Sequence, residues 1–538
     1  MDPVTIVTVG FMVGQFIYHR WIDPPKGPDH EKEIKIPLVA EGTPYPIFFG
    51  RVRVRQPILA MASDFSAFDN INWEFNTDGA VDPAYPFVYG LDMLMLIGIP
   101  VQSGVTRLHN IWAGGIKMSP GTLHGKTIED ATGAGNHEQP SEFDTPFSAQ
   151  AANLQCGMGL VEFLDGGPAQ EVVNSIGTVS KTFLADRMTT LGATPGGIDP
   201  TLMPSFRGFA SAFLFSGAPI GPTAAPTPGD VGSPSSGSPP NPYLKWAVGV
   251  TPQVPAYSFE VSTYPQYGVG PFTQRIGDEM NPADAIYQLL RDHLAKLGLP
   301  VERMDLDSFL AAAITLYAEG HGYSRAFEDR TPALEIIQEI LRQIDATIDE
   351  DPATGTLRLK LIRADFNPTT IPHITVDNCQ GLASFAASGW TGTITKIRAT
   401  YENRANDYQT DSATAQNTAS ALSVNAEIDE IVLSYPGVKT HALAAKIAAR
   451  ELAARSRPLA KFQAVVDMSF APVRTGDAIA ATWPELQMSG RIFRVAKKSN
   501  GGPGSNSIQL DLVEDFFFLH RSELEPNPDV APFPGGSL

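Results

Sequence analysis

Glu319 with His321, near Tyr323, forms a neighbouring acid–base pair, and such a lone pair is a weak signal of chemistry. The three residues alternate within five positions of the chain. A carboxylate beside an imidazole can take a proton from water and return it to a leaving group, which is general acid–base hydrolysis. The same pattern arises when a charge simply lies at a helix end. We therefore predict a structural role for this group and keep hydrolysis as the alternative.

A run of three acidic residues could attract a cation. Asp349, Glu350 and Asp351 crowd carboxylate oxygens before a predicted turn, and oxygen ligands are those that calcium prefers. The glycine and glutamate spacing of an EF-hand loop is missing, however. We predict a solvated hairpin here rather than a metal site.

A row of arginines could bind an anion. Arg51, Arg53 and Arg55 alternate with Val52 and Val54, which is the pattern of a half-buried strand with one charged face. Such a face is more often solvated, or forms a row of salt bridges between subunits, than it binds a small anion. All three interpretations remain open for this strand.

Other catalytic and cofactor patterns are missing from the sequence. No serine lies in a G-x-S-x-G elbow, and no two histidines lie four apart with a glutamate on a predicted helix. The glycine clusters lack the spacing of a phosphate-binding loop and are read as turn glycines, namely Gly133 and Gly135, and Gly501, Gly502 and Gly504. We predict no catalytic, cofactor-binding or metal-binding residue, no cofactor, and a protein that is not an enzyme.

Composition limits the class of protein further. The chain has 538 residues, 43% of them hydrophobic and 18% charged, which is typical of several folded domains. Its 48 glycines and 45 prolines favour turn-rich β structure. The formal charge of −19 opposes binding to phosphate backbones, which depends on lysine and arginine. A DNA-binding protein is therefore disfavoured, whereas a conduit that DNA passes without sticking remains compatible with the charge.

The two cysteines indicate no covalent framework. Cys156 and Cys379 lie far apart in the sequence and form no repeated metal-ligand spacing. We expect two buried thiols, as in a protein that assembles in a reducing cytoplasm.

The N-terminal segment is apolar but short. Residues 4–18 contain no charged side chain, whereas a bilayer span needs about 20 apolar residues. Asp2 precedes the run and Arg20 follows it, which is the wrong order for a secretory signal. We predict a buried helix or a partner contact, with transient contact of residues 4–18 with a host membrane as the minority hypothesis.

Three helices and a hairpin are predicted in the middle of the chain. Asn281, Pro282 and Asp284 form a helix start, in which Asn281 caps the first amides. Turn residues at 351–355 then separate two extended runs. The predicted apolar stripes are Ile286, Leu289, Leu290, Leu294 and Leu297, then Phe309, Ala312, Ala313, Leu316 and Tyr317, then Leu334, Ile337, Ile340, Leu341 and Ile344.

Both flanking regions are predicted to be mostly β. Phe209, Phe213 and Phe215, and then Tyr257, Phe259 and Val261, are expected to lie on strands of one barrel. Regular short strands after residue 460 predict a second barrel or sandwich, with Arg474-Thr475-Gly476-Asp477 in a turn. Residues 411–425 read as a long loop or a weakly held helix, and Met468 as part of the strand that contains Phe462, Ala464 and Val466.

The order of three helices and a hairpin, together with a set of short sequence motifs, resembles the tail-tip hub proteins of bacteriophages, a family that includes the hubs of gene transfer agents. The likeness covers about residues 200–520 and is looser before residue 201. The motifs that carry the resemblance are Pro204-Ser205-Phe206-Arg207-Gly208, Pro255-Ala256-Tyr257-Ser258-Phe259-Glu260-Val261, Asn281-Pro282-Ala283-Asp284, Leu297-Gly298-Leu299-Pro300, Asp305-Leu306-Asp307-Ser308-Phe309, Ala318-Glu319-Gly320, Ile340-Leu341-Arg342-Gln343-Ile344-Asp345, Tyr435-Pro436-Gly437-Val438, Ala448-Ala449-Arg450-Glu451-Leu452, Arg474-Thr475-Gly476-Asp477, Trp483-Pro484-Glu485 and Val513-Glu514-Asp515.

The resemblance implies an α+β, mostly β fold in which two β-barrel-like hub domains flank a helix-rich domain. The predicted parts are an N-terminal apolar helix at 1–30, a first β-rich hub domain at 31–270 with a Gly/Pro/Ser-rich insertion at 217–242, a helix-rich α+β domain with a hairpin at 271–375, a second β-barrel hub domain at 376–520 with a helix at 440–456, and a Pro-rich tail at 521–538.

The resemblance also implies a structural protein of the virion tail tip, assembled in the bacterial cytoplasm. It implies a homotrimer whose ring closes or extends the tail tube, guides DNA ejection and lets DNA pass through the lumen without specific binding. The implied partners are a distal tail or tail tube protein, the tape-measure protein, and tail fibre or receptor-binding proteins. Two alternatives remain: a tail-associated peptidoglycan hydrolase that uses Glu319, and a host-surface adhesin.

Overall fold

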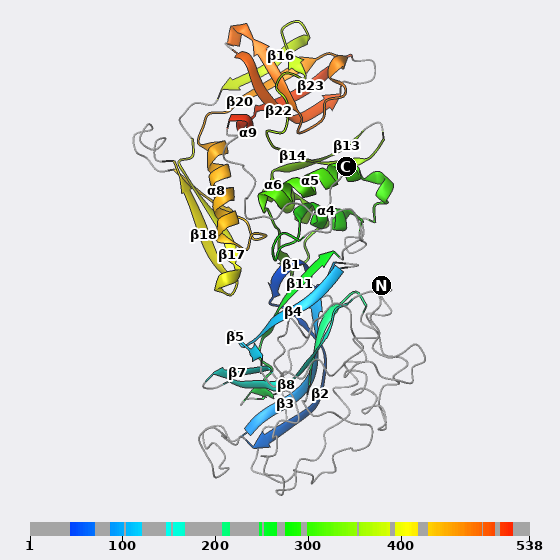
Figure 1. Cartoon of the computed structure of the whole chain (residues 1–538), viewed down its shortest axis with the longest axis vertical. Helices are drawn as coiled ribbons and strands as arrows, with labels where there is room; N and C mark the ends of the chain where they lie inside the picture. Colours follow the sequence, from blue (N-terminus) through cyan, green and yellow to red (C-terminus); the bar gives the residue numbers. More distant parts are fainter. Residues whose placement is uncertain are drawn as a thin grey trace. The chain divides into compact units, whose positions relative to one another are not determined.

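The protein is a mostly β molecule of the α+β class (Figure 1). The structure is a computed structural model that describes residues 43–69, 87–101, 104–120, 147–151, 154–166, 207–215, 247–249, 252–265, 275–291, 298–351, 354–387, 393–417, 429–486, 488–500 and 506–519. The predicted N-terminal helix, the insertion at 217–242 and the tail at 521–538 lie outside these residues. No helix in the described ranges is long and apolar enough to cross a bilayer.

The chain divides into two compact units, which we describe separately. Unit 1 comprises Met1–Gln266 together with Ala326–Arg330, and unit 2 comprises Tyr267–Arg325 and Thr331–Leu538. The short segment Ala326–Arg330 thus belongs to unit 1, although it lies between two parts of unit 2 in the sequence.

One sheet of unit 1 has five strands in the order β12-β1-β11-β4-β5. These strands are β1 (Ile47–Val54), β4 (Gly104–Ala113), β5 (Ile116–Lys117), β11 (Tyr257–Pro265) and β12 (Arg325–Phe327). The pattern of Val52 and Val54 between arginines predicts such a strand, and both valines are buried.

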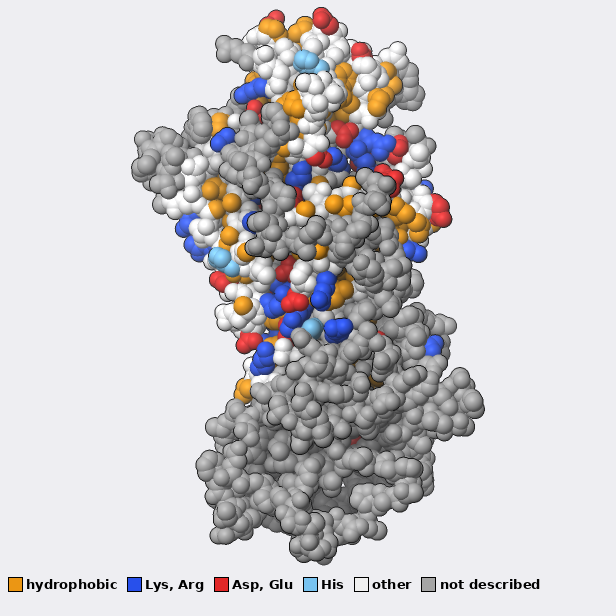
Figure 2. Space-filling view, in the orientation of Figure 1, with side chains coloured by type: hydrophobic (Ala, Val, Ile, Leu, Met, Phe, Trp, Pro, Cys, Tyr) orange, Lys and Arg blue, Asp and Glu red, His pale blue; other side chains and the backbone are white. Residues whose placement is uncertain are grey.

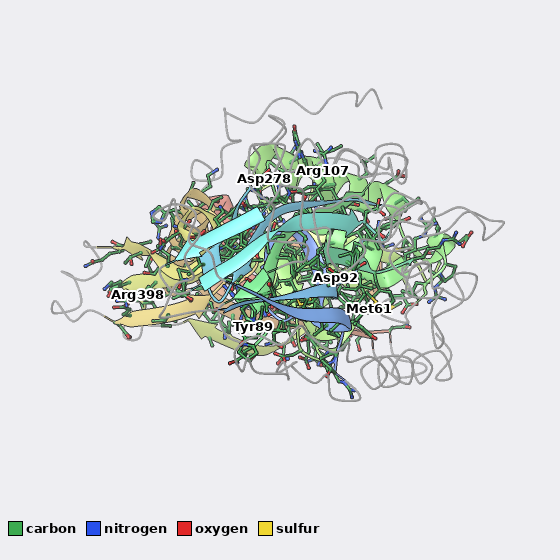
Figure 3. All side chains as sticks on the ribbon, turned by 90° about the horizontal axis from the view of Figure 1, so that it is seen from below. Met61, Tyr89, Asp92, Arg107, Asp278 and Arg398 are labelled. Atoms are coloured by element: carbon green, nitrogen blue, oxygen red, sulfur yellow. The ribbon has the colours of Figure 1, made fainter. Side chains whose placement is uncertain are left out.

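The second sheet of unit 1 has seven strands. Its path runs β10-β3-β9-β8-β7-β6, and β2 pairs with β3. Met61 of β2 and Tyr89 and Asp92 of β3 lie on this strand pair (Figure 3). The strands are β2 (Ile58–Asp69), β3 (Phe87–Gly98), β6 (Ser119–Pro120), β7 (Phe147–Ala151), β8 (Leu154–Leu164), β9 (Ala210–Phe215) and β10 (Ala247–Gly249).

An apolar core of unit 1 draws side chains from both of its sheets. Side chains from β1 and β11, such as Val52 and Phe259, join side chains from β3 and β9, such as Met93 and Leu214, in one buried cluster. The prediction that the strands around Phe213 and Phe259 lie in one barrel is wrong in detail, because β9 and β11 belong to different sheets. Periodicity identifies each strand, but the partner of a strand is set by contacts far away in the sequence.

Unit 2 begins with three helices and a hairpin. They are α4 (Pro282–Arg291), the short 3-10 helix η4 (Val301–Arg303), α5 (Leu306–Glu319), α6 (Ala333–Ile344), β13 (Ala346–Glu350) and β14 (Leu357–Leu361). The Asn281 side chain accepts from the Ala283 amide and donates to the Ala313 carbonyl, so it joins the start of α4 to α5. Asp305 caps α5 in the same way by accepting from the Ser308 amide.

Two details of these helices differ from the prediction. Leu334 is 64% exposed on α6, while the neighbouring Ile336 is buried, so the apolar stripe is rotated from the one predicted. The described part of α4 ends at Arg291, and Leu294 and Leu297 lie outside the described residues.

A three-stranded sheet and one helix follow. The sheet has the order β18-β17-β19, with β17 (Lys396–Asn403), β18 (Gln409–Gln416) and β19 (Glu430–Ser434), and α8 (His441–Arg455) packs against it. The short helix η5 (Arg404–Asn406) joins β17 to β18. The predicted loop or weak helix at 411–425 is therefore wrong up to Gln416, because this polar segment pairs along its whole length with β17.

The last part of unit 2 is a six-stranded sheet in the order β15-β21-β22-β23-β20-β16. In the described residues, β15 and β16 each pair on one side, so the sheet is open and not a closed barrel. Met468 lies after the strand, in a short helix, and is 52% exposed, which corrects its predicted place in the apolar alternation. The elements are β15 (His373–Ile374), β16 (Cys379–Ala387), β20 (Ala460–Val466), η6 (Met468–Phe470), β21 (Ala478–Trp483), η7 (Pro484–Leu486), β22 (Met488–Asn500), β23 (Ile508–Glu514) and α9 (Phe516–Leu519).

Candidate functional site

Glu319 is held by an arginine and does not face an open site. It is the last residue of α5, and Gly320 ends the helix in the left-handed conformation with φ 66°. The two carboxylate oxygens of Glu319 accept from Nε and Nη2 of Arg363, at 2.6 and 2.9 Å. The nearest distance from Glu319 to the Nδ1 of His321 is 4.0 Å. A carboxylate paired in this way is already occupied by a cation, so it is poorly placed to take a proton from water.

His321 is buried and uncharged. Burial, together with the positive charges of Arg450, Arg363 and Lys446, holds the pKa of its imidazole well below the usual range. The His321 side chain is 5% exposed, and within the described residues its Nε2 has no hydrogen-bond partner. The ring is therefore a neutral part of the interior and is shielded from any substrate.

Tyr323 has a hydrogen-bond partner of its own on α6. Its hydroxyl donates to Oε1 of Glu339 on α6, at 3.2 Å, and burial raises the pKa of the phenol well above the usual range. Its ring packs against Gly437, where a Cβ atom would collide with it. The structure thus gives Glu319, His321 and Tyr323 separate structural partners and does not assemble them into a hydrolytic site.

A larger cluster surrounds these residues, and we call it the buried polar network. At its centre, Arg450 of α8 pairs with Asp345 at the end of α6, with 2.6 Å between Nε and Oδ2. Arg450 also donates to the Gln343 carbonyl, and Gln343 donates to the Gly322 carbonyl. The network consists of Glu319, His321, Gln343, Asp345, Arg363, Tyr435, Arg450 and Glu451.

The network joins helices and loops that are distant in the sequence. Tyr435 donates its hydroxyl to Glu451 at 2.8 Å, and Glu451 also pairs with Arg455 one turn later. Burial raises the pKa of Asp345, although the charge of Arg450 opposes this. A buried charge is costly unless it is paired and hydrogen-bonded. These contacts therefore specify how α5, α6 and α8 meet.

The acidic run before the hairpin turn is also paired. Asp349 accepts from Arg358 at 3.1 Å, Glu350 accepts from Arg303 at 2.9 Å, and Asp351 pairs with Arg474. Arginine thus neutralises each carboxylate that was considered for calcium. Within the part of the chain that the structure describes, no group of three His, Cys, Asp or Glu residues is arranged to hold a metal ion.

The motif Arg474-Thr475-Gly476-Asp477 forms a tight turn, as its composition predicts. The Arg474 amide donates to the Asp477 carboxylate at 2.9 Å, and Gly476 has φ 86°, which favours glycine. Arg358 of the hairpin reaches the same carboxylate at 3.3 Å. The turn thereby fastens the six-stranded sheet to the hairpin β13–β14.

The arginine row of β1 lies on the polar face of the five-stranded sheet. Arg51 pairs with Glu260 at 2.8 Å, and Arg53 donates to the Ser258 hydroxyl at 2.9 Å. The Arg53 guanidinium also lies 4.1 Å from the centre of the Trp112 ring. Arg55 lies at the end of the strand, where its backbone amide donates to Glu328.

Two further buried groups escape sequence reasoning. Lys439 is 1% exposed and pairs with Glu402, and Glu279 is buried near Arg404. Burial raises the pKa of Glu279 to about 7, although Arg404 and Lys439 lower it. No sequence pattern marks these residues, since their partners lie far along the chain. The thiol of Cys379 is half-buried rather than buried as expected, and the Cys156 side chain lies outside the described residues.

Comparisons with known proteins show which family and which solved structures the chain resembles. The model of a family described as putative phage tail protein matches residues 332–496. The similarity to this family therefore lies in the helix-rich and C-terminal parts of unit 2. The predicted resemblance to phage tail proteins is thereby confirmed. A comparison with curated proteins finds no match.

One solved structure shares the fold over nearly the whole chain, and two others are similar to part of it. A chain from the virion of a native gene transfer agent particle covers 95% of this chain and 93% of its own length, with TM-score 0.52 and 13% identity. The 43 kDa tail protein of prophage MuSo2 from Shewanella oneidensis covers 51% of this chain and 76% of its own length, with TM-score 0.29 and 11% identity. A tail protein from Neisseria meningitidis MC58 covers 51% and 78%, with TM-score 0.32 and 11% identity.

The region that matches the phage tail family contains most of the buried polar network. Gln343, Asp345, Arg363, Arg450 and Glu451 all lie within residues 332–496. Glu319, the last residue of α5, and His321, just beyond that helix, precede the matched region and complete the network. Several motifs that carry the sequence resemblance therefore contain residues that form buried ion pairs.

Proposed function

We propose that the protein is a structural hub of a virion tail tip or baseplate. The observation that carries the proposal is the fold shared along 95% of the chain with a chain from a gene transfer agent virion. The phage tail family match in residues 332–496 supports the same conclusion from sequence. In this role the protein is not an enzyme, and its buried charges serve to position domains.

The sheets suit an assembly part. Sheets with open edges can pair across subunits and thereby satisfy backbone groups that an isolated edge leaves open. In the described residues of unit 2, β16 and β18 are such edges. We propose that the sheets of residues 31–270 and 376–520 act as the two hub domains, flanking the helix-rich residues 271–375. Three copies would then present six related domains around a lumen.

The proposed assembly has defined neighbours. A homotrimer at the tail tip would contact a distal tail or tail tube protein, enclose the end of the tape-measure protein and attach tail fibre or receptor-binding proteins. The net charge of −19 suits a lumen through which DNA passes without specific binding. Contact of residues 4–18 with a host membrane during ejection remains a separate proposal.

The oligomeric state and particle location test this function. We expect mass photometry of the purified protein to give three times the chain mass of 57.8 kDa, and negative-stain images to show threefold rings. Particles made without the protein should have tails with an incomplete tip. A stable monomer at micromolar concentration, or normal tails in particles that lack the protein, would contradict the proposal.

Hydrolysis is tested separately. Because both oxygens of Glu319 are bound to Arg363, we expect a peptidoglycan zymogram of the wild-type protein to remain free of a lytic band at high loading. A band that disappears in Glu319→Gln would establish the hydrolase alternative instead.

A further inference from the structure

The five-stranded sheet of unit 1 has two faces of opposite character. Val52, Phe259 and Leu108 point from one face into the core of the unit. The other face carries the basic side chains Arg51 and Arg53. The strands pair without a break in β1 and β11, so residues opposite each other share a face.

The register gathers the basic residues of three strands on that second face. Arg51 lies opposite Ser262, and Ser262 lies opposite Arg107 of β4. Lys117 of β5 lies opposite Trp112, which lies opposite Ser258. We call Arg51, Arg53, Arg107 and Lys117, together with His109 and Trp112, the basic face.

The basic face is unusual in a chain of net charge −19. The strands β1, β11, β4 and β5 contain one carboxylate, Glu260, and it is shared by Arg51 and Asn110. In the view of Figure 2, lysine and arginine side chains and a histidine, with some carboxylates among them, lie over the region in which Figure 1 labels β1, β11 and β4. Arg107 lies well separated from Asp92 and Met61 of the other sheet of the unit (Figure 3).

Contacts within the sheet hold the basic face in place. Trp112 is 2% exposed, and the Arg53 guanidinium lies 4.1 Å and the Lys117 ammonium 5.5 Å from the centre of its ring. His109 is fixed by a 2.8 Å contact between its Nε2 and the Ser262 hydroxyl. Cations ordered in advance lose little conformational entropy on binding, so they suit a specific ion-pair interface.

We infer that the basic face binds a carboxylate-rich surface of a second copy of this chain. The inference rests on the proposed homotrimer and deepens it by naming the contact. An acidic protein with 58 Asp and Glu residues against 39 Lys and Arg necessarily offers acidic surface to its neighbours. The planar guanidinium of arginine matches a carboxylate with two parallel hydrogen bonds.

Charge complementarity favours protein over DNA as the partner. Affinity for a duplex depends on the number of phosphates that lysine and arginine side chains neutralise, so a face with few cations contributes little. The basic face has four permanent cations, namely Arg51, Arg53, Arg107 and Lys117. A short cationic face opposite acidic side chains instead fixes register and steers association between protein surfaces.

Charge reversal tests the inference. The variant Arg107→Glu with Lys117→Glu changes two basic side chains at the rim of the sheet and leaves the Arg51–Glu260 pair in place. We expect the concentration at which half of the protein is trimeric to rise at least about tenfold, and the wild-type trimer to weaken as salt increases. The matched control Lys461→Glu, an exposed residue of β20, should leave this concentration unchanged. Circular dichroism melts identify any variant that fails to fold.

Cross-linking gives a second measurement on the wild-type protein. Copies labelled with ¹⁴N and ¹⁵N are mixed, assembled and joined by a carbodiimide that couples amines to carboxylates. We expect Lys117 in mixed-isotope peptides with an Asp or Glu of the other copy. A wild-type trimer in which Lys117 gives no such peptide and the double variant assembles normally overturns the inference but leaves the hub proposal intact.

Two further outcomes also decide the matter. A wild-type protein that stays monomeric overturns the homotrimer and the inference with it. Retention of duplex DNA by the wild type, lost in the double variant while trimers persist, overturns the inference in favour of a phosphate partner.

Discussion

Charged residues of unit 2 that resemble catalytic residues in the sequence form ion pairs in the interior of the structure. Glu319 and Arg363 are 44 positions apart and Asp345 and Arg450 are 105 apart, yet each forms a close ion pair. Their partners could not be predicted from the sequence, because ion pairs between distant segments leave no local periodicity. The residue types in the motifs were visible, but whether they carried chemistry depended on burial and on the partner.

Breaking the Glu319–Arg363 pair should destabilise unit 2. Arg363→Ala leaves Glu319 in the interior with no cation, and loss of one partner from a buried pair typically costs about 3–5 kcal/mol. Denaturant unfolding followed by fluorescence measures this loss. Lys360→Ala is the matched control, because its pair with Asp365 is more exposed and should contribute less than about 1 kcal/mol. Equal losses in the two variants would contradict the assigned role.

Glu279 should make the stability of unit 2 depend on pH. In the unfolded chain its pKa is near the usual 4.5, and in the folded protein burial raises the pKa to about 7. Between these pH values the folded state binds more protons than the unfolded state, so this group's stabilisation is complete below about pH 4.5 and is lost as pH rises through 7.

The variant Glu279→Gln isolates this dependence. It cannot ionise, so the difference in unfolding free energy between wild type and variant should change by on the order of 3 kcal/mol from pH 4.5 to above pH 7. His321, whose pKa burial lowers, gives an opposite trend below its usual pKa of 6.5, but it is present in both proteins and cancels. A difference that stays constant across this range would refute the assignment.

At the scale of elements, local rules predicted most helices and strands but not every pairing. The caps Asn281 and Asp305 lie where helices α4 and α5 start, since capping depends on a few adjacent residues. The strand β18 was missed because its residues are small and polar, and its pairing with β17 decides its conformation. Leu334 shows the same limit, since only the packing of α6 determines which of its apolar residues faces the core.

Close packing between loops predicts a strict need for glycine at position 437. A Cβ atom there would collide with the Tyr323 ring and lie 2.6 Å from Oε1 of Gln343. We expect Gly437→Ala to lower the unfolding free energy by about 1–3 kcal/mol through overpacking. Gly381→Ala is the control, because nothing lies within 4 Å of its added methyl group. Thermal melts of the two variants should therefore differ, and matching melting temperatures would exclude the packing argument.

At the scale of the whole molecule, composition and the family resemblance predicted a mostly β phage tail protein, and both are confirmed. The predicted domain boundaries remain a proposal. The division into two compact units was not foreseen in its discontinuous form, because Ala326–Arg330 belongs to a unit whose other residues end at Gln266. Nothing in the composition of this five-residue segment marks it as part of the first unit.

Two compact units predict two unfolding events. Arg363→Ala should lower only the calorimetric transition of unit 2. Phe259→Ala, which removes a fully buried ring from the core of unit 1, should lower only the other transition, by about 3–5 kcal/mol of unfolding free energy. One transition that moves in both variants would mean that the chain unfolds as a single cooperative body.

Unit 1 cannot be completed during synthesis until the segment Ala326–Arg330 has been translated. Phe327 contacts Phe49 edge to face, and Glu328 accepts from the Arg55 and Gln56 amides, so this segment covers the outer edge of β1. After adding Gln266, the ribosome must translate roughly 60 more residues before this segment can cover the edge of β1. At about 5–20 residues per second this takes several seconds. During this interval the edge of β1 lacks its partner strand, so its backbone groups are open to pairing with other chains.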